Sequence, residues 1–181
     1  LINNVNTLYD LIKKKKTNSI ILNYDESSYD LFKWYQQLVA ESLGKSSKGV
    51  LPIISDMPKD NHSLMQLYLD GNKNCFFTFF DVIDANSPKI KNKILDNFKY
   101  LKGHSLQSIK LAQKQATQIV FKAKKIPFRS FEILKRNEET LGELFTFFML
   151  ETILLGKMMK INPFDQPAVE LIKKETKKIL V

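Results

Sequence analysis

The stretch Cys75-Phe-Phe-Thr-Phe-Phe-Asp-Val82 is apolar at nearly every position, and the rest of the fold can be worked out from it. A strand with one solvated face alternates apolar and polar residues, whereas a strand buried on both faces is apolar almost throughout. The stretch therefore predicts the central strand of a sheet covered on both sides. Cys75 is the single cysteine and stands beside Phe76 and Phe77, which favours a buried structural thiol over a nucleophile.

Three further apolar runs bounded by polar residues predict strands at Ser19–Leu22, Val50–Ile54 and Phe128–Leu134. Helical spacing of apolar residues predicts helices around Leu8–Ile12, over Tyr29–Leu43 with a stop at Gly44, around Leu64–Tyr68 with a stop at Gly71, over Ser105–Lys124, and from Asn137 to near Gly156. Strands separated by such helices require a parallel sheet with helices on both faces. We therefore predict an α/β fold, a doubly wound, mainly parallel sheet of four to five strands that ends in a C-terminal helix. In such sheets ligands bind beyond the carboxyl ends of the strands, so the loops after the four strands are the first places to expect chemistry.

The composition indicates one compact globular domain. Of 181 residues, 44% are apolar and 26% charged, as in folded soluble proteins. No apolar run approaches the ~20 residues that a membrane span needs. The Lys13–Lys16 block follows the first apolar residues, unlike a signal peptide. With one cysteine fitting a reducing compartment, we expect a cytoplasmic protein without a membrane partner, and the initial leucine suggests a piece of a longer polypeptide.

The chain has 28 basic and 19 acidic residues, a formal net charge of +9. Lysine supplies nearly all of the positive charge, since Arg129 and Arg136 are the only arginines. Apart from Lys13–Lys16, the lysines are interpreted as scattered over solvated helix faces. Base readout and bidentate phosphate binding usually depend on arginine, so a nucleic-acid-binding domain is the less favoured interpretation. A modest positive field would also attract a phosphorylated sugar.

The segment Asn162-Pro-Phe-Asp-Gln-Pro-Ala-Val-Glu-Leu-Ile-Lys173 joins a rigid loop to a helix start. Its two prolines fix φ and keep the residues before them extended, and a helix is predicted from about Pro167. Lys173 shares a face of that helix with Val169 and Leu180, so we expect it to meet the body of the protein. Gln166 can present its amide to the same cleft. The alternative is a capped surface helix with a snorkelling lysine.

Glu41 lies in the last turn of the helix predicted over Tyr29–Leu43, within Ala40-Glu-Ser-Leu-Gly-Lys45. The negative end of the helix dipole disfavours its ionised form, which is the direction that a proton shuttle near neutral pH needs. The alternative is a frayed surface glutamate, paired with Lys45.

His62 lies in Asp60-Asn-His-Ser-Leu-Met-Gln66. Asp60 or Asn61 as helix N-cap would place His62 in the first helical turn, where the positive dipole end keeps imidazole neutral. The alternative is a solvated or capping histidine. For His104, in a Lys-Gly-His-Ser loop, a structural or solvent role is expected.

The three segments resemble motifs of the glucose-6-phosphate isomerase family, and the resemblance spans roughly Ile20 to the C-terminus. The family's C-terminal signature reads Asn-Pro-Phe-Asp-Gln-Pro-Gly-Val-Glu and ends in a lysine; this chain departs from it at Ala168. The resemblance implies that Glu41 carries a proton between C1 and C2 through a cis-enediol, as in the short bacterial type. It also implies that His62 assists ring opening in the neighbouring subunit's site, that Lys173 supports the O1/O5 region, and that Gln166 contacts the sugar or its phosphate.

The resemblance further implies that residues 1–181 form a single C-terminal sugar isomerase (SIS) domain with a helical tail, whose N-terminal sugar isomerase domain is absent. The missing half would supply a Ser/Thr-rich phosphate loop and the arginine that stabilises the enediolate. We therefore expect interconversion of glucose 6-phosphate and fructose 6-phosphate without metal or cofactor, in a homodimer of the full enzyme, and no turnover by this chain alone. The rival interpretation is a non-catalytic sugar-phosphate-binding or dimerisation module of the same fold. The choice between glucose and mannose specificity, and bifunctionality, stay open.

Overall fold

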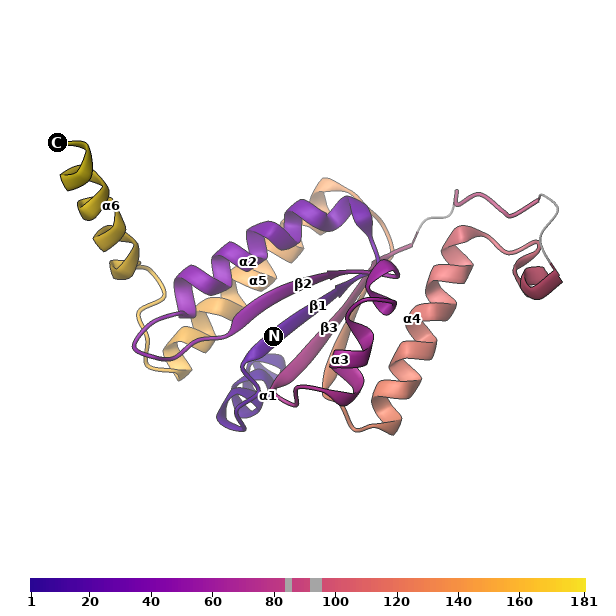
Figure 1. Ribbon diagram of the computed structural model, residues 1–181, viewed down its shortest axis with the longest axis horizontal. Helices are drawn as coiled ribbons and strands as arrows, with labels where there is room; N and C mark the ends of the chain where they lie inside the picture. The colour runs from indigo at the N-terminus through magenta and orange to yellow at the C-terminus, as the bar shows by residue number, and fades with distance from the viewer. Residues whose placement is uncertain (84–85, 92–95) are drawn as a thin grey trace.

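The computed structural model describes residues 1–83, 86–91 and 96–181 of the chain (Figure 1). Within these residues the fold is built on a parallel four-stranded sheet with the order β2-β1-β3-β4. The strands are β1 Asn18–Asn23, β2 Leu51–Asp56, β3 Cys75–Val82 and β4 Phe128–Ile133. All four strands predicted from the sequence are present, and the central position of Cys75–Val82 is confirmed.

The described residues form six α-helices, of which α1 to α5 cover the sheet. They are α1 Ile2–Lys13, α2 Tyr29–Leu43, α3 Met65–Asp70, α4 Leu106–Ala123, α5 Glu138–Met158 and α6 Pro167–Leu180, with short 3-10 turns η1 Glu26–Ser28, η2 Lys59–Asn61 and η3 Asp96–Leu101. Helices α1, α2 and α5 pack on one face of the sheet, and α3 and α4 pack on the other (Figure 1). The predicted doubly wound α/β fold with a C-terminal helix is confirmed.

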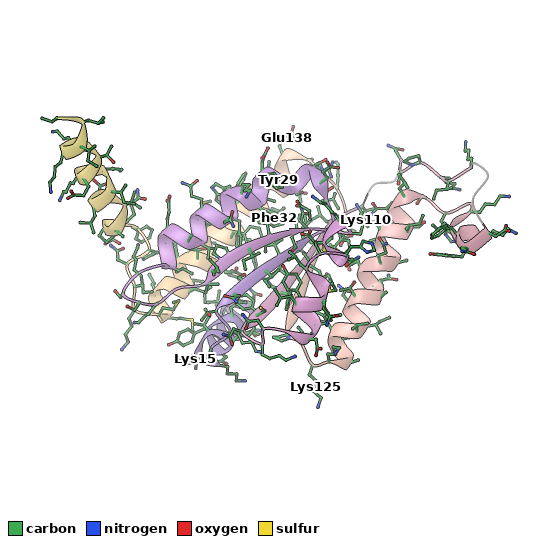
Figure 2. All side chains as sticks on the ribbon, in the orientation of Figure 1. Lys15, Tyr29, Phe32, Lys110, Lys125 and Glu138 are labelled. Atoms are coloured by element: carbon green, nitrogen blue, oxygen red, sulfur yellow. The ribbon has the colours of Figure 1, made fainter. Side chains whose placement is uncertain are left out.

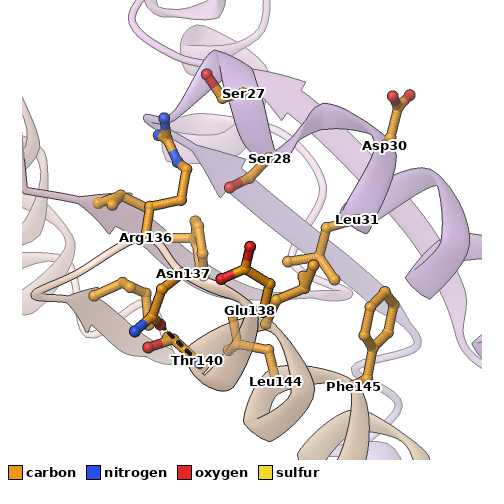
Figure 3. A pocket seen from close by; sticks show the side chains of 14 residues that line it. Ser27, Ser28, Asp30, Leu31, Arg136, Asn137, Glu138, Thr140, Leu144 and Phe145 are labelled. Atoms are coloured by element: carbon orange, nitrogen blue, oxygen red, sulfur yellow. Dashed lines mark hydrogen bonds between the residues drawn. The ribbon is translucent and has the colours of Figure 1, made fainter.

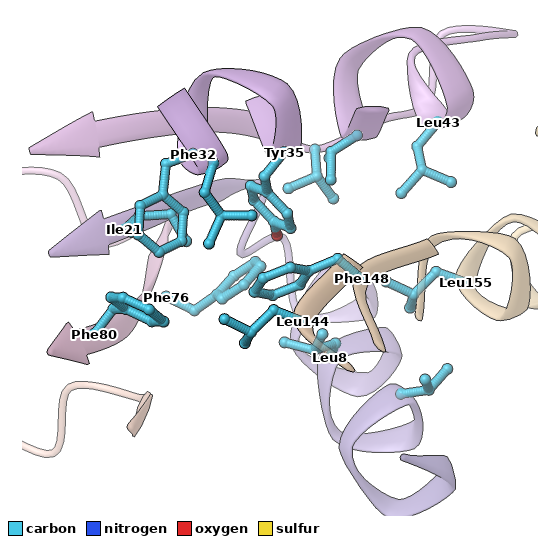
Figure 4. Close-up of a cluster of buried hydrophobic side chains, with 14 of the residues drawn as sticks. Leu8, Ile21, Phe32, Tyr35, Leu43, Phe76, Phe80, Leu144, Phe148 and Leu155 are labelled. Carbon is cyan, nitrogen blue, oxygen red and sulfur yellow. The ribbon is translucent and has the colours of Figure 1, made fainter. Parts of the chain in front are cut away.

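Strand β3 supplies both halves of the core. Phe76 and Phe80 pack among the helices on the α2 and α5 side (Figure 4), whereas Phe77 and Phe79 pack on the α3 and α4 side. All four side chains are buried, and each stabilises the fold by roughly 1.5–3 kcal/mol relative to an exposed side chain. Cys75 is buried too, as its aromatic neighbours predicted.

The ends of the long helices follow the capping residues seen in the sequence. Gly44 directly follows α2, where its backbone N–H donates to the Ala40 carbonyl. The side chain of Asn137 accepts a hydrogen bond of 3.0 Å from the Thr140 N–H at the start of α5. Ser105 does the same for α4. These caps fix where the loops around the sheet begin.

Helix α6 packs no buried face on the rest of the described chain, although its first residues line a groove with the end of α2. It projects from the end of the molecule (Figure 1), and none of its residues is buried. The expectation that its apolar stripe packs against the body is therefore not met within this chain. In the loop before α6, Pro163 packs closely on Gly156 of α5, where an added Cβ would be 3.1 Å from the Pro163 Cβ.

Candidate active site

A pocket of about 550 Å³ lies at the carboxyl edge of the sheet, where α/β folds usually bind ligands (Figure 3). Its walls come from η1, the ends of β3 and β4, and the first turns of α5, with an apolar floor that includes Leu31, Phe80 and Leu144. Arg136 stands at its rim and forms an ion pair with the buried carboxylate of Asp25. None of Glu41, His62, Gln166 and Lys173 lines this pocket.

Two of the predicted site residues lie instead at the amino edge of the sheet. Helices α2 and α5 each follow a strand and run back antiparallel to it, so both helices end at this edge. The end of α2, the turn at 44–48 and the segment 160–169 form a groove of about 710 Å³ there. Glu41 and Gln166 both line this groove, which we call the amino-edge groove. The structure thus brings together the carboxylate and the amide of two motifs that are 125 positions apart.

Lys45 holds the two motifs against each other. Its Nζ donates to the Asn162 carbonyl at 2.5 Å and pairs with the Asp165 carboxylate at 2.8 Å, while its side chain is only 10% exposed. The hydrogen bond from Lys45 is the main cause of a lowered pKa of Asp165. Lys48 adds a second connection by donating to the Met159 carbonyl at 2.9 Å. The loop that positions Gln166 is therefore fastened to the turn that follows Glu41.

Glu41 lies in the last turn of α2, as the sequence predicted, and its side chain is exposed. The Gln37 side chain, one turn earlier, donates to its carboxylate at 3.1 Å. The alternative pairing of Glu41 with Lys45 does not occur, because Lys45 is engaged with Asp165. A carboxylate that is accessible, oriented by an amide and placed at the wall of a groove can accept a proton from a bound substrate.

His62 lies at the opposite edge of the sheet, in the connection after β2. The helix that follows begins only at Met65, so neither Asp60 nor Asn61 is its N-cap and the expected first-turn position of His62 is wrong. The Asp60 carboxylate instead accepts hydrogen bonds from the Asp56 N–H and the Ser63 hydroxyl, both at 2.8 Å, which stabilise a compact turn before the helix. The imidazole is exposed on this turn.

Lys173 lies on the projecting helix α6 and is exposed. Its Nζ pairs with Glu170 one turn earlier at 2.7 Å. It lines a shallow apolar surface of α6 together with Val169, Ile172 and Leu180, and not the amino-edge groove. Within this chain Lys173 and Glu41 are therefore not brought into one pocket.

Both arginines of the chain are paired with carboxylates of the chain. Arg129 donates to Glu151 at 3.0 Å and to Thr78 at 2.9 Å inside the sheet–α5 layer, and Arg136 is paired with Asp25. In the described ranges, no three His, Cys, Asp or Glu side chains are grouped as a metal site would require. No described helix is both long and apolar enough to cross a bilayer.

Sequence reasoning missed Lys45 and Asp165 as site residues. Both stand inside the segments that were singled out, one four positions after Glu41 and the other one position before Gln166. The available signal was the opposite charge of Lys45, near Glu41, and Asp165, beside Gln166. Only the structure shows that these two residues form an ion pair, because it places the ends of α2 and α5 at the same edge of the sheet.

The chain is similar in sequence to part of several known proteins. No protein family model matches the chain. Glucose-6-phosphate isomerase of Mycoplasmopsis pulmonis is 37% identical over 177 residues, which cover 94% of this chain and 41% of that protein. The isomerase of Methanocaldococcus jannaschii is 33% identical over 181 residues, covering 94% of this chain and 42% of that protein. The chain thus spans about two fifths of the length of the curated relatives it matches.

Solved structures show the same fold. A hypothetical protein from Thermus thermophilus superposes with a TM-score of 0.87 at 26% identity, over 96% of this chain and 44% of that one. A glucose-6-phosphate isomerase from Chlamydia trachomatis superposes with a TM-score of 0.73 at 17% identity, over 91% of this chain and 34% of that one. The second likeness concerns the fold alone.

Proposed function

We propose, from its homology to a segment of the glucose-6-phosphate isomerases, that this chain is the C-terminal sugar isomerase domain of such an enzyme. The activity is the interconversion of glucose 6-phosphate and fructose 6-phosphate, a cytoplasmic reaction of glycolysis and gluconeogenesis. The observation that carries the proposal is the amino-edge groove, where Lys45 fastens the loop of Gln166 beside Glu41. Two motifs with no sequence proximity converge there on one surface.

Glu41 acts as the base in this proposal. Its carboxylate removes the C2 proton of the open-chain aldose to give a cis-enediolate, a proton passes from the O2 hydroxyl to O1, and Glu41 returns its proton to C1 to give the ketose. One carboxylate suffices because the proton leaves and returns on the same face of the substrate. Gln166 contributes an amide to the sugar or its phosphate, and the reaction uses neither a metal nor a cofactor.

His62 and Lys173 complete the site from other directions. Because His62 lies at the edge of the sheet opposite to Glu41, it serves ring opening in the site of a second copy, which makes the working unit a homodimer. Lys173 stands on a helix whose apolar residues Val169 and Leu180 are exposed, so packing of α6 on another domain or copy would carry its ammonium group to the substrate.

The remaining groups belong to the N-terminal sugar isomerase domain. Arg129 and Arg136 are committed to Glu151 and Asp25, so neither is free to stabilise an enediolate. That arginine and a Ser/Thr-rich phosphate loop come from the part of the relatives that this chain does not span. We therefore expect the 181-residue chain to be inactive alone and to become active only with the missing half.

Replacement of the base tests the assignment. In the full-length enzyme, Glu41→Gln should lower turnover by about 10²–10⁴-fold, which is the range of general acid–base catalysis. Exchange of the C2 proton with deuterated solvent should be lost to the same extent, while calorimetric binding of the sugar phosphate stays. Glu143→Gln, at an exposed position of α5, is the matched control and should keep full activity. Retained C2 exchange in the Glu41 variant would place the base elsewhere.

The alternative is a non-catalytic sugar-phosphate-binding or dimerisation module. The unpartnered apolar residues of α6 favour it, because a docking role alone would explain them. It predicts sugar-phosphate binding or self-association without turnover, even after the missing half is added. Activity in that mixture contradicts this alternative.

A further inference from the structure

Another hollow at the amino edge of the sheet has four lysines among its lining residues, beside apolar ones such as Leu69 and Phe77. It has a volume of about 230 Å³ and lies among the loops that lead into β1, β3 and β4. Its rim carries Lys16, Lys73, Lys124 and Lys125, and no Asp or Glu is among its lining residues. We call it the lysine pocket. It shares no lining residue with the amino-edge groove.

The fold gathers these lysines from distant parts of the chain. Lys16 follows α1, Lys73 precedes β3, and Lys124 and Lys125 follow α4. Lys16 Nζ donates to the Lys73 carbonyl at 2.6 Å, which ties two of the three loops together. Figure 2 shows Lys15 and Lys125 at the same edge of the molecule. The interpretation of the lysines as scattered is therefore wrong for this edge.

Helix ends account for only part of this positive charge. Helices α1, α3 and α4 end here, and each C-terminus carries about half a negative charge that a lysine can offset. Asp70, the last residue of α3, adds a carboxylate next to the lining residue Leu69. The three helix ends and Asp70 together offset about two and a half of the four positive charges of the lining lysines, which leaves a positive surplus. A concave surface with surplus positive charge concentrates anions.

We propose that the lysine pocket binds a phosphoanhydride chain, either inorganic or at the end of a nucleotide. Lysine ammonium groups bind phosphate as point charges, and several of them around a hollow suit an anion whose charges are spread along a chain. The volume is below the roughly 300 Å³ at which pockets for drug-sized ligands begin, so the phosphates enter and any nucleoside stays outside. The pocket contains no arginine that would fork onto a single phosphate. Because it is separate from the amino-edge groove, its occupation does not depend on the isomerase assignment.

Calorimetric titration of the 181-residue chain tests the proposal with tripolyphosphate, orthophosphate and ATP as probes. Tripolyphosphate should bind at least about tenfold more tightly than orthophosphate, with an affinity that falls as salt rises. The Lys73→Gln/Lys125→Gln variant should weaken tripolyphosphate binding by about tenfold. Lys174→Gln/Lys177→Gln removes the same charge from α6 and should change binding less than about twofold. Equal affinities for ATP and tripolyphosphate would show that the phosphate chain suffices, and a tighter ATP complex would identify a nucleotide as the source.

Two results would overturn the proposal. Equal weakening in both double variants would mean that net charge alone attracts the anion. Tighter binding of a single-stranded oligonucleotide than of tripolyphosphate, with a steep salt dependence, would assign the surface to nucleic acid instead. Circular dichroism and unfolding curves of both variants confirm that folding is unchanged, since all four replaced side chains come from surface segments.

Discussion

The charges inside the α5 layer and those beside the amino-edge groove are held in different ways. Arg129 donates to Thr78, Asn4 and Glu151, and the carboxylate of Glu151 is only 2% exposed. Lys45 makes two bonds, but its carboxylate partner Asp165 is 52% exposed. An interior pair that loses one member leaves a charge with no access to water, whereas the loop partner can be hydrated. We therefore expect the pair Arg129–Glu151 to stabilise the fold and the pair Lys45–Asp165 to position the loop of Gln166.

The largest expected effect breaks the interior pair. Glu151→Gln removes a buried counter-charge and leaves the Arg129 guanidinium, which is only 15% exposed, unpaired, and it should lower the free energy of unfolding by about 3–5 kcal/mol. Urea unfolding followed by circular dichroism measures it. Glu143→Gln on the exposed side of the same helix should change stability by less than about 0.5 kcal/mol. A loss below about 1 kcal/mol in Glu151→Gln would show that water reaches the pair and that the contrast with the groove is false.

The second prediction concerns Lys45 as a positioning residue. In the full-length enzyme, Lys45→Met should lower kcat/KM by about 10- to 100-fold, because a displaced loop misplaces Gln166 relative to Glu41. The unfolding free energy should fall by less than about 1 kcal/mol, since the pair is partly hydrated. Lys33→Met, at an exposed position of α2, the helix that precedes the turn of Lys45, is the control. A large stability loss with unchanged kcat/KM would reverse the assignment.

The smallest expected effect is a titration shift. Lys45 lowers the pKa of Asp165 below its ordinary value of 3.8, so removal of the ammonium group in Lys45→Met should raise that pKa back toward 3.8. Because the folded-state pKa is the lower one, the interaction is fully present above pH 3.8 and is lost as the pH falls through the folded value. Carboxyl-carbon NMR measures the shift.

Asp10 provides the internal control for this titration. Its pKa is lowered by a hydrogen bond from Lys13, which the Lys45 variant leaves intact. Its titration curve should therefore be the same in both proteins. An unchanged Asp165 curve in the variant would mean that Lys45 does not hold the loop in solution.

Most of the architecture could be predicted from the sequence because it depends on local patterns. The apolar run Cys75–Val82 and the helix Tyr29–Leu43 have the same bounds in the structure as in the prediction. Asn137 marked the start of a helix because its side chain can accept a hydrogen bond from a free backbone N–H of the first turn. Gly44 marked the end of one because glycine adopts the backbone conformations that commonly follow a helix.

What the sequence could not supply depends on packing between distant segments. The start of α3 moved to Met65 because a turn stabilised by Asp60 comes first, and no periodicity reveals such a turn. The groove of Glu41 lies at the amino edge because a helix that returns from a parallel strand must end there. The rule that ligands bind at the carboxyl ends of parallel strands locates the pocket beside Arg136, but it does not locate the amino-edge groove.

Gly156 affects the width of the amino-edge groove, although it is not among the residues that line it. A methyl group added at this position would lie 3.1 Å from the Cβ of Pro163, which is closer than an ordinary van der Waals contact. The ring would have to move by a few tenths of an ångström and take the following loop with it. The spacing between the proposed base and the amide thus depends on a residue without a Cβ that stands outside the groove, and whose carbonyl accepts a hydrogen bond of 2.9 Å from the N–H of Ile161 in the groove wall.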